Sequence, residues 1–208
     1  MRILIADDHP IVRHGLRQIL ADADDVSTVG EAASEADVLG QLRAQPWDVL
    51  VLDLAMPGRS GLETLKLVRA EWPRLPILIL SMYSEDQYAI RALRAGADGY
   101  LTKESAAEKL LEAIRKVKGG GKYVSARLAE RLAIEVGRSG SRLPHEALSD
   151  RELQVLIFLG SGKTVGEIAD LLALSVKTVS TYRTRILEKT GLRNNAELVQ
   201  YAMEHKLV

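Results

Sequence analysis

Cysteine is absent from the 208-residue sequence, so disulfide bonds, thiol catalysis and thiolate metal sites are excluded. The apolar runs are far shorter than a membrane span. Met1-Arg2 leads directly into a short strand-like run, without the apolar core of a signal peptide. We therefore expect a cytoplasmic protein that does not enter the membrane.

Net charge is absent as well, because 28 basic residues balance 28 acidic ones. Residues 145–208 are also balanced, with 8 Lys and Arg against 8 Asp and Glu, although nucleic-acid-binding domains usually carry a basic excess. An argument for DNA binding must therefore rest on where individual charges lie. The length and an apolar fraction of 47% are typical of a globular protein with two domains.

The first 120 residues alternate short apolar runs with segments of helical periodicity. Continuous apolar runs at 3–6, 49–52 and 77–80 predict strands that are buried on both faces, as in a parallel sheet. Weaker runs lie at 26–31 and 99–101. The predicted helices cover residues 10–20, 34–44, 61–70, 84–95 and 105–118. This order predicts a doubly wound α/β domain of the (βα)5 type.

The pattern changes after the glycines at 119–121. Residues 121–145 form a predicted linker with one helix at 125–136 and a flexible stretch at 137–144. Every later segment has helical periodicity, so residues 146–208 predict an all-α domain of four helices. Capping boxes are predicted for Ser84 with Gln87, Ser105 with Glu108, Ser149 with Glu152 and Thr164 with Glu167.

Polar residues that could take part in catalysis or ligand binding follow four of the predicted strands. Asp7 and Asp8 come directly after the first strand, and Asp53 ends the third. Ser81 and Lys103 end the fourth and fifth strands. Because the carboxyl ends of parallel strands meet at one edge of the sheet, we expect these five side chains to converge there.

Clustered carboxylates repel one another, and a divalent cation such as Mg²⁺ would offset that cost. A carboxylate can also attack phosphorus to give an aspartyl phosphate, while a nearby lysine holds a phosphoryl oxygen. The alternative is that these acids are solvated loop residues or helix N-caps, which is the usual explanation for a single one. The five positions together favour phosphoryl chemistry. The adjacent His9 is interpreted as a loop residue, because the four histidines show no ligand spacing.

Four motifs around these positions resemble the receiver domains of bacterial two-component response regulators. They are the segments 3–10, 52–58 with Gly61, 80–81 and 96–103. The resemblance makes residues 1–120 the receiver domain and implies a flavodoxin-like sheet with strand order 2-1-3-4-5. The sequence departs from the usual receiver pattern at Glu104, where many receivers have proline, and at the bulky Met82.

This resemblance also implies a role for each site residue. Asp53 would be the phosphoacceptor, Lys103 and Ser81 would contact the phosphoryl group, and Tyr100 would change rotamer in response. The implied Mg²⁺ ligands are Asp8, Asp53, the backbone carbonyl of Ala55 and, through water, Asp7.

The C-terminal region has the spacing of a helix-turn-helix. A helix at 164–172 precedes a turn at 173–175, and a longer helix at 176–189 ends at Gly191. Ser175 is the predicted N-cap of the second helix. The predicted shared core is Ile168, Leu171, Leu172, Val179, Ile186 and Leu187. The second helix carries hydrogen-bond donors on its outer face: Lys177, Thr178, Ser180, Thr181, Tyr182, Arg183, Thr184, Arg185 and Lys189.

A basic helix alone would usually be a solvated amphipathic helix. Its surroundings, however, resemble the LuxR-type helix-turn-helix, in the segments 148–155, 167–169, 174–182 and 189–192. Together with a receiver, the chain resembles the NarL/FixJ family of response regulators. The resemblance places Ser180, Thr181 and Thr184 closest to base edges. It also implies that DNA phosphates are contacted by Lys177, Thr178, Tyr182, Arg183 and Arg185.

The family resemblance implies a transcription factor that is not an enzyme beyond assisting its own phosphorylation and dephosphorylation. A sensor histidine kinase would phosphorylate Asp53 in a Mg²⁺-dependent reaction. Phosphorylation would control homodimerisation and binding to double-stranded DNA, with RNA polymerase as a further candidate partner.

Two alternative functions are weighed against this one. In the first, the chain binds DNA and its receiver is only a structural dimerisation module. In the second, it is a Mg²⁺-dependent phosphatase with an aspartyl nucleophile. The phosphatase is disfavoured because Ala55, two residues after Asp53, cannot serve as the general acid.

Overall fold

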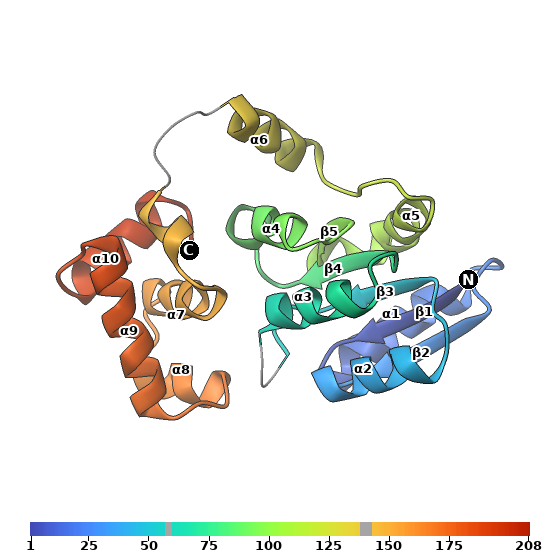
Figure 1. Cartoon of the computed structure of the whole chain (residues 1–208), viewed down its shortest axis with the longest axis horizontal. Helices are drawn as coiled ribbons and strands as arrows, with labels where there is room; N and C mark the ends of the chain where they lie inside the picture. Colours follow the sequence, from blue (N-terminus) through green and yellow to red (C-terminus); the bar gives the residue numbers. More distant parts are fainter. Residues whose placement is uncertain (57–59, 138–142) are drawn as a thin grey trace. The chain divides into compact units, whose positions relative to one another are not determined.

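A computed structural model of the chain describes residues 1–56, 60–137 and 143–208, and their side chains except those of 86, 87 and 135–137. The chain divides into two compact units, Met1–Glu135 and Val136–Val208. Figure 1 shows an α/β unit and a helical unit. Pro57 and Gly58 of the second motif, and residues 138–142 of the predicted linker, lie outside the described residues.

The first unit is built on a five-stranded parallel sheet, which confirms the predicted fold. Its order is β2-β1-β3-β4-β5. Hydrogen bonding holds β1 level with β3, because Ala6 pairs with Leu52. The two strands therefore end at the same edge. The strands are β1 (Arg2–Ala6), β2 (Thr28–Ala32), β3 (Val49–Leu52), β4 (Ile77–Ser81) and β5 (Gly99–Thr102).

Helices cover both faces of this sheet (Figure 1). The central strands are apolar at nearly every position because both of their faces are buried. On one face, α1 (Pro10–Ala21) and α5 (Ala106–Lys118) enclose a core with β1, β3, β4 and β5. The other face is covered by α2 (Glu35–Ala44), α3 (Gly61–Glu71) and α4 (Glu85–Arg94). After α5 comes α6 (Ala126–Gly137).

Two of the four predicted capping boxes are wrong, and both belong to the first unit. The Ser84 side chain makes no cap hydrogen bond, although Ser84 is the N-cap of α4. Ser105 closes a 3-10 turn, Lys103–Ser105, so its backbone is already helical and its hydroxyl accepts a bond from Thr102 instead. A capping box that the sequence reading did not single out starts α3, where Ser60 and Glu63 bond reciprocally.

The second unit is helical, as predicted. A short 3-10 turn, Pro144–Ala147, precedes its first helix. The capping boxes at Ser149 and Thr164 are confirmed, and Ser175 accepts a bond from the Thr178 amide. Gly191 ends the third helix in the left-handed conformation, with φ of 73°. The helices are α7 (Asp150–Gly160), α8 (Val165–Leu171), α9 (Val176–Thr190) and α10 (Asn195–Glu204).

The predicted core of the helix-turn-helix is correct except at Leu171. Ile168, Leu172, Val179 and Ile186 are buried, and Leu187 is partly buried. Leu171 is 55% exposed, because it lies one helical step, about 100°, away from Leu172 on the helix surface. Within the described ranges, no helix combines the length and the apolar composition that a membrane crossing requires.

Candidate functional site

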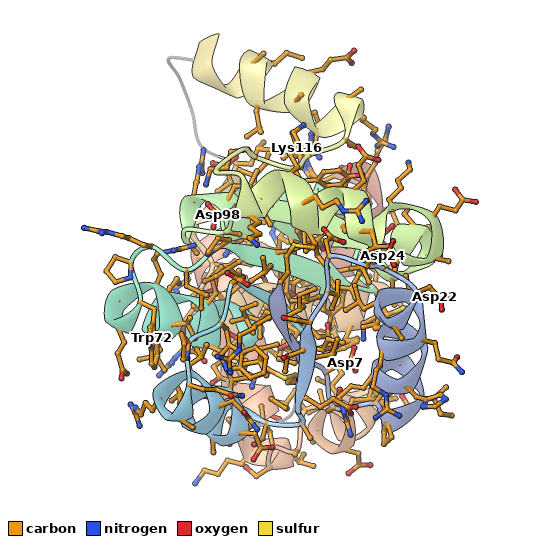
Figure 2. The ribbon with its side chains drawn as sticks, turned by 90° about the vertical axis from the view of Figure 1, so that its right-hand side faces the viewer. Asp7, Asp22, Asp24, Trp72, Asp98 and Lys116 are labelled. Atoms are coloured by element: carbon orange, nitrogen blue, oxygen red, sulfur yellow. The ribbon has the colours of Figure 1, made fainter. Side chains whose placement is uncertain are left out.

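Two buried aspartates lie where β1 and β3 end. Asp7 and Asp53 are each only 1% exposed. The Asp53 amide donates to the Ala6 carbonyl at 2.8 Å, and the Asp7 amide donates to the Ala32 carbonyl at 3.1 Å. These bonds extend the strand pairing by one residue, so the sheet itself fixes both carboxylates at one edge. Figure 2 labels Asp7.

Lys103 connects the two carboxylates. Its Nζ lies 2.6 Å from Asp7 Oδ2 and 2.8 Å from Asp53 Oδ2. Burial raises the pKa of Asp53, and the Lys103 ammonium opposes that shift. Burial alone would lower the pKa of Lys103, but attraction by Asp53 and Asp7 raises it. Lys103 is therefore a charged bridge from the end of β5 to the ends of β1 and β3.

Asp8 adds a third carboxylate to this edge. Its Oδ1 is buried and accepts no hydrogen bond, although the His9 Nδ1 lies 2.8 Å away. The side chains of Asp7, Asp8, His9 and Asp53 each offer a ligand atom within 4.8 Å of the others. Three carboxylates face one lysine, so negative charge is left over. Hard oxygen donors with excess negative charge suit a cation such as Mg²⁺.

Ser81 and Tyr100 occupy the neighbouring strands and are fully buried. The Ser81 hydroxyl accepts a hydrogen bond from the Tyr83 amide at 3.2 Å. The Tyr100 hydroxyl donates to the Tyr83 carbonyl at 2.8 Å, so the ring points inward. Burial raises the pKa of Tyr100, which keeps it protonated. The Ala55 amide donates to Asp53 Oδ1 at 3.1 Å and holds that carboxylate from the other side.

Two residues make contacts at this site that were not expected from the sequence. His9, interpreted as a loop residue without a role, approaches Asp7 and Asp8 through one ring nitrogen. Arg13, on α1, donates through Nη1 to the Asp7 carbonyl at 2.7 Å and through Nε to Glu31 at 3.0 Å. No local pattern signals the Arg13 contacts, because they join a helix to the ends of two strands.

The outer face of α9 brings together four of the predicted DNA-binding residues. Val179 and Ile186 are buried and fix which side of the helix faces the core. The opposite side carries a stripe with helical spacing, and all four of its members are exposed: Lys177, Ser180, Thr181 and Thr184. Arg185 is exposed beside it. The hydroxyls of Thr181 and Thr184 donate to helix carbonyls, and a hydroxyl oxygen that donates can still accept a hydrogen bond.

Other predicted members of this surface are held by neighbouring helices. Lys189 Nζ lies 2.6 Å from Glu152 Oε2 on α7. Arg183 Nε donates to Asn195 Oδ1 at 2.5 Å, at the start of α10. Thr178 and Tyr182 are half-buried on the flanks of α9. The structure therefore separates an open stripe from basic residues that also link α9 to the rest of the unit.

Comparison with known families gives two matches along the chain. Residues 3–115 match the response regulator receiver domain. Residues 146–202 match the luxR family of bacterial regulatory proteins.

Whole-length relatives have the same combination. The chain is 37% identical to the response regulator GacA of Pseudomonas aeruginosa, over all of this chain and 98% of GacA. It is 34% identical to the response regulator UvrY of Escherichia coli K12, over all of this chain and 95% of UvrY. A solved structure of RcsB from Salmonella enterica serovar Typhimurium, bound to promoter rprA with the phosphomimetic BeF3⁻, is similar with a TM-score of 0.65. It is 31% identical, over 97% of this chain and 98% of that one. The chain belongs to the NarL/FixJ family of response regulators, with a receiver domain followed by a LuxR-type helix-turn-helix.

Proposed function

We propose that this response regulator accepts a phosphoryl group on Asp53 and that the modification controls DNA binding by α9. The contact of Lys103 with both Asp7 and Asp53 carries the proposal. It collects, at one edge of the sheet, a nucleophile, a fixed cation and a second acid. A structural dimerisation module would have no use for this buried, charged arrangement.

The chain's own residues support each part of phosphoryl transfer. The Asp53 carboxylate attacks phosphorus, and the leaving group departs on the opposite side. Lys103 moves its hydrogen bond from the carboxylate to a phosphoryl oxygen, and Ser81 donates its hydroxyl to another. Ser81 ends β4, the strand beside β3, and Lys103 follows β5, the next strand in the sheet. No general acid is required when the phosphodonor is a histidine kinase or an acyl phosphate.

Mg²⁺ fits the remaining donors at this edge. The buried Asp8 Oδ1, which accepts no hydrogen bond, is the observation that supports the fit. Asp8 and Asp53 would hold the ion directly, Asp7 through water, and the Ala55 carbonyl would complete the protein ligands. When bound, the ion neutralises charge on the carboxylates and the phosphoryl oxygens.

Tyr100 and the β4–α4 loop form the proposed switch. A phosphoryl group draws Ser81 inward. This movement changes the conformation of the loop, whose Tyr83 carbonyl accepts the hydrogen bond from the Tyr100 hydroxyl.

The receiver is proposed to span residues 1–120, the linker 121–145 and the DNA-binding domain 146–208. A cytoplasmic location is part of the same proposal.

The DNA-binding part of the proposal rests on the α9 stripe. Short hydroxyl side chains approach base edges, while lysine and arginine neutralise phosphates. Ser180, Thr181 and Thr184 are the proposed base contacts, and Lys177 and Arg185 lie at the right place for phosphates. A homodimer would read two half-sites about one helical turn apart. The similar structure of RcsB, which is bound to promoter rprA, supports DNA binding by this chain. A sensor histidine kinase as phosphodonor and RNA polymerase as a further partner complete the proposal.

The test combines intact mass with DNA selection. The full-length protein is incubated with Mg²⁺ and acetyl phosphate, beside Asp53→Asn and the exposed control Asp24→Asn. We expect one added phosphoryl group on the wild type and on Asp24→Asn, none on Asp53→Asn, and tighter binding of selected DNA by the modified protein. A phosphoryl group added to Asp53→Asn, or a DNA affinity that is the same with and without the phosphoryl group, would contradict the proposal.

A further inference from the structure

The chain between α5 and α6 docks on the open edge of the sheet. The Tyr123 amide donates to the Asp98 carbonyl at 2.9 Å, and the Tyr100 amide donates to the Tyr123 carbonyl at 2.9 Å. These bonds make a parallel bridge between Tyr123 and Gly99 of β5. We call residues 122–128 the edge segment, because it extends the sheet beside its last strand.

Side-chain contacts fix the start of the edge segment. Lys122 Nζ lies 2.7 Å from Asp98 Oδ1, and the Tyr123 ring is buried in the core beneath α5. Lys116 lies over that ring, 5.7 Å from its centroid. Figure 2 labels Asp98 and Lys116, which hold the segment at Lys122 and Tyr123. The segment is therefore a packed element of the first unit.

Ser125 joins the other end of the edge segment to α4. Its hydroxyl donates to Glu85 Oε2, at the first residue of α4, and accepts a bond from the Leu128 amide at 3.1 Å. Ser125 is thus the N-cap of α6 and is also hydrogen-bonded to the first residue of α4. Leu128, in the first turn of α6, is only 1% exposed. The Ser125 hydroxyl therefore connects the first turn of α6 to the start of α4.

A short series of contacts connects the phosphoacceptor site to the Ser125–Glu85 hydrogen bond. Ser81 ends β4 and Glu85 starts α4 four residues later, so one short loop joins them. Within that loop, Tyr83 donates to the Ser81 hydroxyl and accepts from the Tyr100 hydroxyl. Tyr100 in turn donates its amide to Tyr123. The edge segment therefore contacts the first residue of α4, directly after the loop, and the backbone of Tyr100.

From these contacts we infer that the edge segment transmits the state of Asp53 to the linker, with Ser125 and Glu85 as its positioning residues. The inference rests on the proposed phosphorylation of Asp53. In the unmodified protein Glu85 holds Ser125, so α6 stays docked. When Ser81 moves inward, the loop and Glu85 move with it, Ser125 loses this partner, and the start of α6 is released.

Hydrogen exchange of the full-length protein, with and without Mg²⁺ and acetyl phosphate, tests this path. In the wild type, modification is expected to speed exchange in residues 125–132 about fivefold, the effect of losing one helix cap. Ser125→Ala and Glu85→Ala should show fast exchange there before modification and little further change after it. Ser125→Thr, which keeps the hydroxyl, should restore the wild-type response.

The matched control is Ser34→Ala, which removes an equivalent cap from α2, where the Asp37 amide donates to Ser34 Oγ at 3.2 Å. It should exchange faster in α2 and leave residues 125–132 unchanged in both states. All variants should gain the phosphoryl group by mass, while Ser125→Ala should lose most of the modification-dependent gain in DNA affinity. The inference would be overturned if Ser125→Ala kept the wild-type gain in DNA affinity on modification. It would also be overturned if hydrogen exchange in the wild type did not change although mass confirmed the phosphoryl group. A wild type that takes up no phosphoryl group would refute the proposed function and the inference together.

Discussion

Asp53 is a buried carboxylate whose position favours reactivity over stability. Burial raises its pKa, and the nearby Asp7 charge adds to that shift, while Lys103 opposes it. An acid whose pKa is raised in the folded state destabilises the fold once pH rises above its ordinary value. At neutral pH, therefore, the ionised Asp53 lowers the free energy of unfolding. Functional sites commonly store strain of this kind.

Asp53→Asn should stabilise the protein as it abolishes phosphorylation. The substitution removes one of the crowded charges and leaves Lys103 paired with Asp7 at 2.6 Å. We expect the thermal unfolding midpoint of the first unit to rise on the order of 2–4 °C at pH 7 without Mg²⁺. Calorimetry of the full chain measures it, with Asp24→Asn as the exposed control. A lower midpoint would mean that the Lys103–Asp53 pair outweighs the cost of burial.

At the scale of single residues, the sequence predicts the position of a side chain well where that position follows from the strand or helix that carries it. Asp7, Asp53 and Lys103 meet because each ends a strand of one parallel sheet, and strand ends can be read from apolar runs. The partners of Lys189 and Arg13 could not be read in this way. Glu152 and the Asp7 carbonyl reach them from other elements, through packing that has no sequence period.

Among the elements, the edge segment depends on Gly99 having no side chain. A Cβ there would lie 2.9 Å from the Tyr123 Cβ and carbonyl oxygen, and 2.9 Å from a Leu78 methyl. Gly99→Ala should therefore lower the free energy of unfolding by about 1–3 kcal/mol. It should also speed exchange of the Tyr100 and Tyr123 amides more than that of β1. Gly15→Ala in α1, where a Cβ meets nothing within 4 Å, should be neutral or stabilising.

The stripe on α9 makes a separate prediction about salt. Lys177 is exposed at the start of the helix, where a phosphate contact releases a bound counterion. Lys177→Ala should weaken binding to all DNA sequences about equally and reduce the slope of log affinity against log salt by about 1. Fluorescence anisotropy at several salt concentrations measures the slope. Lys109→Ala removes the same charge from α5 and should leave the slope unchanged.

Element boundaries follow from the sequence where capping and periodicity agree. Ser149, Thr164 and Ser175 start helices as predicted, because each hydroxyl satisfies a free backbone amide. Ser105 fails because a 3-10 turn brings it into the helix before it can cap. The edge segment could not be predicted, since one bridge to Gly99 leaves no alternation of apolar and polar residues.

Across the whole molecule, each unit contains a partly buried carboxylate whose pKa is lowered, Asp98 in the first unit and Glu152 in the second. In the first unit, burial raises the pKa of Asp98, but bonds from Lys122, the Ile77 amide and Arg69 outweigh it and lower the pKa overall. In the second unit, burial likewise opposes Lys189 and Ser149, which together lower the pKa of Glu152. Each ionised carboxylate therefore stabilises its own unit.

Acid should remove the stabilising charges of Asp98 and Glu152. A carboxylate with a lowered folded pKa contributes its full stability above its unfolded value, 3.8 for Asp98 and 4.5 for Glu152, and loses it as pH falls through the lower folded value. Calorimetry of the full chain from pH 6 to pH 3 should show the midpoint of the second unit falling, and that of the first unit falling in Asp53→Asn, where protonation of Asp53 no longer offsets the loss at Asp98. Asp98→Asn should flatten the pH dependence of the first unit alone, and Glu152→Gln that of the second. If Glu152→Gln left the second unit's pH dependence intact, the ionised Glu152 would not stabilise the unit through its bond to Lys189, and Lys189 would be available to contact DNA.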